Sequence, residues 1–77
     1  MIDYKEYITI EPGKRSGQPC IRHMRITVGD ILSYLASGMS IDEILEDFPK
    51  LQREDILAAL AYAADAQKRM AIIKTAA

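Results

Sequence analysis

The chain has 77 residues, which is enough for one small domain, and we predict a single domain over residues 1–77. Its hydrophobic content of 49% and charged content of 27% are typical of a globular protein rather than a disordered chain. The net charge of −1 argues against a generic nucleic-acid binder, because such proteins usually carry an excess of Lys and Arg.

The composition also predicts where the protein is found. A single cysteine excludes a disulfide within the chain and fits a reducing compartment. The N-terminal stretch MIDYKEYITIEP contains acidic residues and no apolar run, so no signal peptide is expected. No apolar run approaches the roughly 20 residues that span a bilayer. These features predict a cytoplasmic protein that does not bind a membrane.

A β-hairpin is predicted at the N-terminal end. Residues 7–10, Tyr-Ile-Thr-Ile, are aromatic and β-branched, which favours a strand. Residues 11–14, Glu-Pro-Gly-Lys, favour a type II turn with glycine at its third position. A returning strand over residues 21–26 is predicted to complete a hairpin arm over residues 1–26. Such a hairpin is unstable alone in water, so it must pack on helices or on a second subunit.

Two short helices are predicted next, each with its own start and stop signals. Thr27 is predicted to cap the first helix, and Gly38 to end it. Ser40 is predicted to cap the second helix with Glu43 at the capping-box position, and Pro49 stops that helix. Their apolar residues recur at i, i+3, i+4 and i+7, which predicts one buried face on each helix. These residues are Val28, Ile31, Leu32 and Leu35, then Ile41, Ile44, Leu45 and Phe48.

A longer third helix is predicted from Arg53, in a segment rich in alanine and other strong helix formers. Its predicted core stripe consists of Ile56, Leu57, Leu60, Ala63 and Ala64. The helical bundle covers residues 27–69, and residues 70–77 are predicted to extend the last helix or to fray. The predicted fold is mainly α, a short N-terminal β-hairpin followed by a three-helix, helix-turn-helix-like (homeodomain-like) bundle. Periodicity alone does not separate a DNA-reading geometry from any other small helical bundle.

Cys20 and His23 have a spacing that some metal sites use. A structural zinc needs about four ligands, and the chain has no second Cys or His. A Cys-His nucleophile pair needs the imidazole within hydrogen-bond reach, whereas residues three apart on a straight strand point to opposite faces. We therefore predict a small buried thiol and a surface imidazole, no metal, no cofactor and no enzymatic activity.

Five basic residues are candidates for contact with DNA phosphates or bases. They are Lys14, Arg15, Arg22, Arg25 and Arg53. The first four cluster in the hairpin, and the last opens the third helix, where helix-turn-helix proteins reach base edges. The alternative for the hairpin residues is a charged strand edge that discourages pairing with other chains. Glu54 and Asp55 follow directly, and they are more simply explained by the positive end of the helix dipole.

Residues 27–49 carry five Asp and Glu and no Lys or Arg, whereas each flank carries five basic residues against three acidic ones. Four of these acidic residues lie on and around the exposed side of the predicted second helix. They are Asp42, Glu43, Glu46 and Asp47. Such a face is usually just solvated. Alternatively, it binds a basic protein partner through complementary charge.

The stretch from Tyr7 to Ala64 resembles the bacterial and archaeal family known as domain of unknown function 433. The resemblance is carried by a strand, a Gly-Lys-Pro-x-Ile-x-Gly-Thr-Arg-Ile-x-Val segment, a Gly-x-Ser-x-Glu-Glu-Ile segment, Tyr-Pro-x-Leu and a final Ala-Tyr-Ala. The matching positions are Gly17, Pro19, Ile21, Arg22, Arg25, Ile26, Val28, Gly38, Ser40, Glu43, Ile44, Pro49, Leu51 and Tyr62. The chain departs at His23-Met24, which replaces Gly-Thr, and at Gln52, a weaker helix cap than Ser or Thr. Because His and Met lack glycine's freedom at positive φ, the tight turn is expected to be lost and the hairpin to be straighter.

The resemblance implies an antitoxin-like role, because members of that family are often encoded beside a PIN-like nuclease and are taken to neutralise it. The leading prediction is a small homodimeric antitoxin that binds its own promoter DNA through the helix-turn-helix-like unit. On this view the basic residues contact DNA, and the acidic second helix or the tail meets the toxin. The alternative is a protein-interaction or dimerisation module without DNA binding, which the net charge and the acidic start of the third helix favour.

Overall fold

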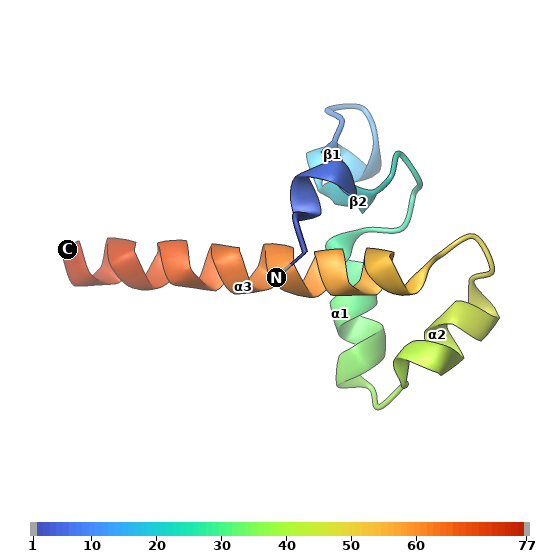
Figure 1. The fold of residues 1–77 in the computed structure, drawn as a ribbon. Helices are drawn as coiled ribbons and strands as arrows, with labels where there is room; N and C mark the ends of the chain where they lie inside the picture. The colour runs from blue at the N-terminus through green and yellow to red at the C-terminus, as the bar shows by residue number, and fades with distance from the viewer. Residues whose placement is uncertain (1, 77) are drawn as a thin grey trace.

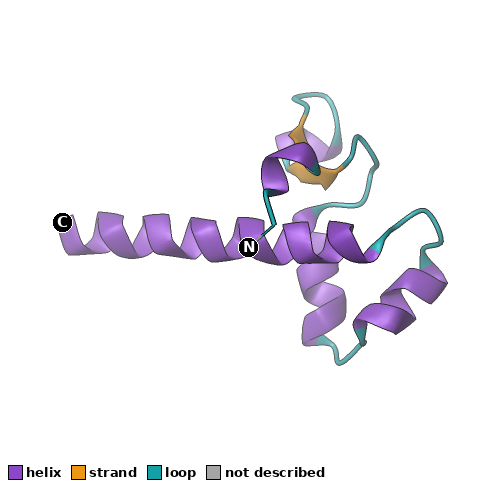
Figure 2. Ribbon diagram, in the orientation of Figure 1, coloured by secondary structure: helices purple, strands orange, loops and turns teal. Residues whose placement is uncertain are grey.

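A short antiparallel hairpin precedes three helices (Figures 1 and 2). The structure, a computed structural model, describes the backbone of residues 2–76 and the side chains of residues 2–70. Its elements are η1 (Tyr4–Glu6), β1 (Ile8–Ile10), η2 (Arg15–Gly17), β2 (Pro19–Ile21), α1 (Val28–Ala36), α2 (Ile41–Asp47) and α3 (Arg53–Ala76). The predicted fold class, mainly helical with an N-terminal β-hairpin, is confirmed. Residues 70–77 are predicted to extend the last helix or to fray; α3 runs to Ala76, and residue 77 lies outside the described residues.

The hairpin is shorter than predicted. β1 pairs with β2 through Ile8 opposite Ile21, Thr9 opposite Cys20 and Ile10 opposite Pro19. The predicted strand over residues 21–26 is wrong, because the chain leaves the strand after Ile21 and turns. The chain then comes back beside β2, because the Ile21 N–H donates to the Ile26 carbonyl at 2.9 Å. Residues 22–25 therefore form a closed loop.

The predicted type II turn over residues 11–14 is also wrong in its details. The Lys14 N–H does donate to the Glu11 carbonyl at 3.0 Å, so the turn exists. Gly13 does not have the positive φ that a type II turn requires at its third position. Positive φ occurs just after this turn instead, at Arg15, Ser16 and Gly17.

The ends of α1 and α2 follow the predicted capping rules. The Thr27 hydroxyl accepts from the Asp30 N–H at 2.9 Å, and the Asp30 carboxylate accepts from the Thr27 N–H at 3.0 Å. Ser40 and Glu43 form the same reciprocal pair at the start of α2. Gly38 has φ of 101°, which is the left-handed conformation expected just beyond a helix C-cap.

The core lies where the hairpin, α1 and α2 meet the first turns of α3 (Figure 1). Its fully or almost fully buried members are Ile21, Val28, Ile31, Ile44, Leu51, Ile56 and Ala59. The predicted stripe of α3 is partly wrong, because Leu57 is 42% exposed and Leu60 is 39% exposed. Ile56 of the predicted stripe is buried in the core together with Ala59, and α1, α2, β1 and η1 all contact α3.

The second half of α3 projects beyond the hairpin and the other helices (Figure 1). Before that, the N-terminal turn η1 lies against its middle: the Tyr4 and Tyr62 rings meet edge to face at 5.3 Å, and the Tyr4 hydroxyl donates to Asp65 at 2.5 Å. This hydrogen bond raises the pKa of Tyr4 and lowers the pKa of Asp65. Among the described residues, no helix combines the length and apolar character needed to cross a membrane.

Candidate interaction surface

A tight turn follows β2 at the position where the sequence predicts that it is lost. The Met24 N–H donates to the Ile21 carbonyl at 2.7 Å, and the two residues between them have positive φ, 40° at Arg22 and 65° at His23. Two positive φ values in succession are the pattern of a type I′ turn. The expectation of a straighter hairpin is therefore wrong. A left-handed residue other than glycine costs about 1–2 kcal/mol, so surrounding contacts must hold this turn.

The strongest of these contacts is an ion pair between the turn and the start of α3. The Arg22 guanidinium donates from Nε to Asp55 Oδ1 at 2.8 Å and from an Nη atom to Asp55 Oδ2 at 2.7 Å. It also donates to the Lys50 carbonyl at 2.9 Å. Asp55 is fully buried and accepts a hydrogen bond from the Gln52 N–H at 2.8 Å. This bond satisfies a backbone donor at the start of α3, where Gln52 is a weak N-cap residue. These hydrogen bonds to Asp55 raise the pKa of Arg22.

Two further cations, from the loop between β1 and β2, contact the same turn. Lys14 donates to the His23 carbonyl, and Arg15 donates to the Arg25 carbonyl at 2.5 Å and to Asp30 at 2.9 Å. Lys14 also lies 3.2 Å from Glu11, and its hydrogen bond lowers the pKa of that carboxyl group. The two cations at the hairpin tip therefore supply hydrogen-bond donors to carbonyl groups of the tight turn.

The five residues predicted to contact DNA thus differ in their surroundings. Arg53 donates to Asp42 at 2.7 Å across the α2–α3 connector, so it is engaged as well. Arg25 is exposed and makes no ion pair among the described residues. Four of the five candidates are therefore paired within the chain, and their cationic groups do not form one open surface.

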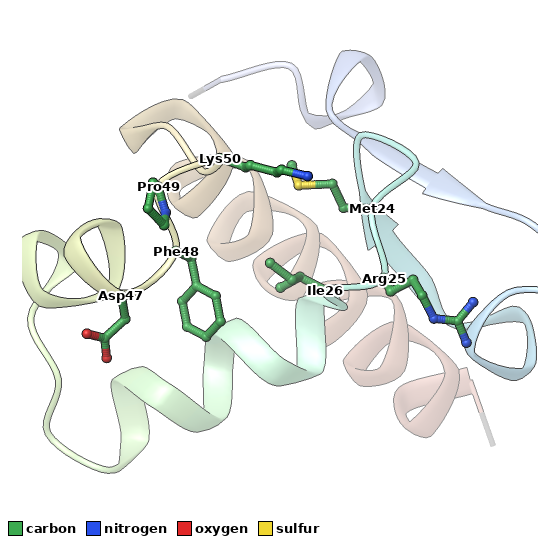
Figure 3. Close-up of a pocket in the computed structure, with 7 residues that line it drawn as sticks. All are labelled: Met24, Arg25, Ile26, Asp47, Phe48, Pro49 and Lys50. Carbon is green, nitrogen blue, oxygen red and sulfur yellow. The ribbon is translucent and has the colours of Figure 1, made fainter.

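An apolar groove of about 380 Å³ lies beside the turn (Figure 3). Residues 24–26 form one wall, and residues 47–50, at the end of α2, form the other. Met24, Ile26 and Phe48 supply the apolar lining, and Phe48 is fixed by stacking on Tyr34 with ring centroids 5.2 Å apart. Asp47 and Lys50 belong to the wall at the end of α2, and Arg25 belongs to the other wall, with its side chain pointing away from Phe48. The strained turn therefore positions one wall of a hollow that has space for an apolar side chain.

The four acidic candidates lie on α2, where Asp47 alone among them lines the groove, and they also differ in their surroundings. Asp42 pairs with Arg53, and Glu43 accepts the Ser40 N–H at 2.9 Å, which lowers the pKa of Glu43. Glu46 and Asp47 are exposed and make no ion pair among the described residues. Only these two keep their charges open to a partner.

Cys20 and His23 do not meet. Cys20 is fully buried, and its thiol donates to the Gln18 carbonyl at 3.3 Å. His23 is exposed, with Nδ1 3.4 Å from Glu11. The part of the chain that the structure describes holds no group of three or more metal-ligating side chains.

Sequence reasoning missed the buried Asp55 and the groove. For Asp55 a signal was present: it occupies the third helical position after a weak cap, where a carboxylate can accept the cap's N–H. For the groove no signal was available, because its two walls are far apart in the sequence and are brought together by tertiary contacts such as that of Arg22 with the Lys50 carbonyl.

The pH dependence of stability provides a test of the Arg15–Asp30 contact. Burial raises the pKa of Asp30, but the Thr27 N–H and the Arg15 guanidinium more than offset it, so the pKa lies below its usual range. Stability contributed by a lowered pKa is present above the unfolded-state pKa and is lost as pH falls through the folded-state pKa. Urea unfolding should therefore show the wild type losing more stability than Asp30→Asn between pH 6 and about pH 3. Equal losses would show that Asp30 is not held in its charged form.

The left-handed backbone at His23 gives a second test. His23→Gly removes a cost of about 1–2 kcal/mol, offset by about 0.5–1 kcal/mol of glycine entropy, so we expect a net gain of about 0.5 kcal/mol. Met24→Gly is the matched control. It should lower the free energy of unfolding, because Met24 has no positive φ and packs against the core. A loss of stability in His23→Gly by urea unfolding would contradict the turn geometry.

Comparisons with known proteins agree with this fold. A family model described as "Protein of unknown function (DUF433)" matches residues 8–63. An uncharacterized protein, y4eO, from Sinorhizobium fredii is 36% identical over 59 residues, which cover 77% of this chain and 27% of that protein. A crystal structure of a DUF433 member protein from Anabaena variabilis superposes with a TM-score of 0.75 at 35% identity, covering 80% of this chain and 61% of that one. The chain thus spans less than two thirds of the length of either relative.

Proposed function

The chain belongs to the DUF433 family, and on that premise we propose that it is an antitoxin-type protein that binds a PIN-like nuclease encoded beside it. The observation that carries the proposal is the apolar groove between residues 24–26 and residues 47–50. Protein partners bind most tightly where one apolar or aromatic side chain enters a well-packed pocket surrounded by polar groups.

The construction of the groove supports a binding role. One wall follows a turn with two left-handed residues, and contacts made by Lys14, Arg15 and the turn's own Arg22 hold it in place. Backbone strain that the surroundings over-determine is concentrated at functional sites. A rigid groove of this kind accepts a side chain with little loss of entropy in the binding protein.

The charges around the groove define the chemistry of the partner. Glu46 and Asp47 lie on the α2 side, and Arg25 and Lys50 lie along the rim. A complementary segment carries an apolar side chain, with a basic residue on the side that faces α2 and an acidic residue on the other. Such a segment of the nuclease is the proposed occupant, because charge complementarity sets orientation and specificity.

The start of α3 supports a protein partner more than a DNA-reading role. Glu54 is exposed there, Asp55 is buried beneath Arg22, and Arg53 is paired with Asp42. The next exposed residues of the helix are Leu57 and Leu60. Base edges and phosphates are read by donors and cations, so this face is poorly suited to them.

The test is co-expression of the chain with the nuclease, followed by size-exclusion chromatography and a growth assay. We expect a stoichiometric complex and relief of nuclease toxicity. Asp47→Lys and Lys50→Glu should each weaken the complex by about tenfold or more, because each reverses a charge on the groove rim. Both residues are exposed, so the variants should keep the wild-type circular dichroism spectrum.

Lys5→Glu, exposed on η1, is the matched control and should bind like the wild type. A complex that neither rim reversal weakens would place the nuclease elsewhere on the surface. Absence of any complex would remove the antitoxin proposal.

Promoter DNA is a second candidate ligand, and the exposed Arg25 beside Lys14 and Arg15 favours it. On this view the hairpin tip, rather than α3, contacts phosphates. A mobility-shift titration should then show binding that weakens steeply with salt, and Arg25→Ala should reduce the slope of log affinity against log salt by about 1. No shift at low salt would remove the DNA role and leave the protein partner untouched.

A further inference from the structure

One face of α3 is charged at both ends and apolar between them, where Leu57 is 42% exposed and Leu60 is 39% exposed, whereas Ala61 is 4% exposed. Leu57, Leu60, Ala61 and Ala64 line a shallow hollow of about 380 Å³ together with Ile2. Glu54 lies one turn before this set and Lys68 one turn after it, so helical spacing places both on the same face. Both are exposed, and neither makes an ion pair among the described residues.

The spacing of this face is that of a helix–helix interface. Residues 54, 57, 61, 64 and 68 alternate in steps of three and four, which is the pattern of a coiled-coil seam. The half-buried Ala64 beside the two exposed leucines leaves room for another helix to approach, to about 8–10 Å between axes. Leu57 and Leu60 stand beside them as side chains large enough to enter a facing hollow.

The face is complementary to itself in one orientation. Glu54 lies seven residues before Ala61 and Lys68 seven residues after it, so each is about 10 Å along the axis from that alanine. An antiparallel copy centred on Ala61 brings Glu54 of each chain to Lys68 of the other, twice. The same operation sets Leu57 of one chain level with residue 65 of the other, next to the small Ala64. A parallel copy would instead place like charges together.

We propose that this face, residues 54–68 of α3, is a homodimer interface in which two copies pair antiparallel about a two-fold axis at Ala61. The projecting half of each α3 then lies along the first half of its partner (Figure 1). This interface is separate from the groove between residues 24–26 and 47–50, so it does not depend on the proposed function. Each copy keeps its own groove.

The test is sedimentation analysis of the wild type and of charge variants over a dilution series at low salt. The wild type should dimerise. Glu54→Lys and Lys68→Glu each replace two attractive pairs with two repulsive ones, so each should weaken the dimer about tenfold or more. The double variant restores both pairs in reverse and should dimerise like the wild type. An equal mixture of the two single variants should form heterodimers.

Two controls separate these effects from general charge effects and from misfolding. Glu46→Lys makes the same charge change on α2 and should leave the dimer intact. Leu60→Glu places a charge in the hollow and should leave only monomers with unchanged helical content. A wild type that stays monomeric, a dimer that ignores both charge reversals, or a double variant that fails to recover would each overturn the interface. The groove variant Asp47→Lys should dimerise normally, so failure of the nuclease proposal would leave this result unchanged.

Discussion

Arg22→Ala is expected to lower the free energy of unfolding by about 3 kcal/mol. This is the largest effect that we expect from removing a partly exposed side chain. The substitution leaves the fully buried Asp55 without its counter-charge. The value lies at the low end for a broken buried pair, because Arg22 is 34% exposed and Asp55 keeps the Gln52 N–H. The turn over residues 22–25 also loses its tie to α3. Urea unfolding followed by circular dichroism measures the change.

Arg25→Ala is the matched control for this prediction. Arg25 lies in the same turn, is exposed and makes no ion pair among the described residues, so its removal should change stability by no more than about 0.5 kcal/mol. On the Arg22→Ala background, Asp55→Asn should recover part of the loss, because it removes the unpaired buried charge. Equal effects of Arg22→Ala and Arg25→Ala would show that the ion pair does not hold the turn.

Ile56→Ala is expected to cost a similar amount, about 3 kcal/mol. The side chain is fully buried in the core where α3 meets α1 and the hairpin. Removing it loses the transfer energy of the deleted carbons and leaves a cavity that close packing cannot fill. In a chain of this length the loss is a large part of the total stability. The thermal midpoint and the urea midpoint should both fall.

Leu57→Ala distinguishes the two faces of the same helix. Leu57 is 42% exposed, so within one copy its truncation should cost less than about 1 kcal/mol. Measured at concentrations where the chain dimerises, the cost should rise, because the proposed interface buries this residue. If Leu57→Ala destabilises the monomer as much as Ile56→Ala, the observed orientation of α3 is contradicted.

Features governed by neighbouring residues were predictable from the sequence. Thr27 with Asp30, and Ser40 with Glu43, cap their helices because the partners lie three residues apart. Gly38 ends α1 for an equally local reason. The family resemblance added the order of the elements, and the fold agrees with it.

Features governed by distant contacts were not predictable in this way. His23 adopts a glycine-like conformation because cations at positions 14, 15 and 22 hold the turn around it. Asp55 follows the pattern of an exposed acidic residue at a helix start, yet it is buried because Arg22 reaches it from 33 residues away. The buried face of α3 was misassigned because leucine and alanine occur on all its sides, so hydrophobicity alone did not orient it.

The most direct test of the proposed binding role is NMR mapping of the isotope-labelled chain with the purified nuclease. Amide shifts at residues 24–26 and 47–50 should change most, with smaller changes at Glu46, because the nuclease side chain enters the groove there. The amides of residues 57–64 should report only the dimer and stay constant on addition of the nuclease. Changes confined to α3, with the groove amides unaffected, would contradict the account.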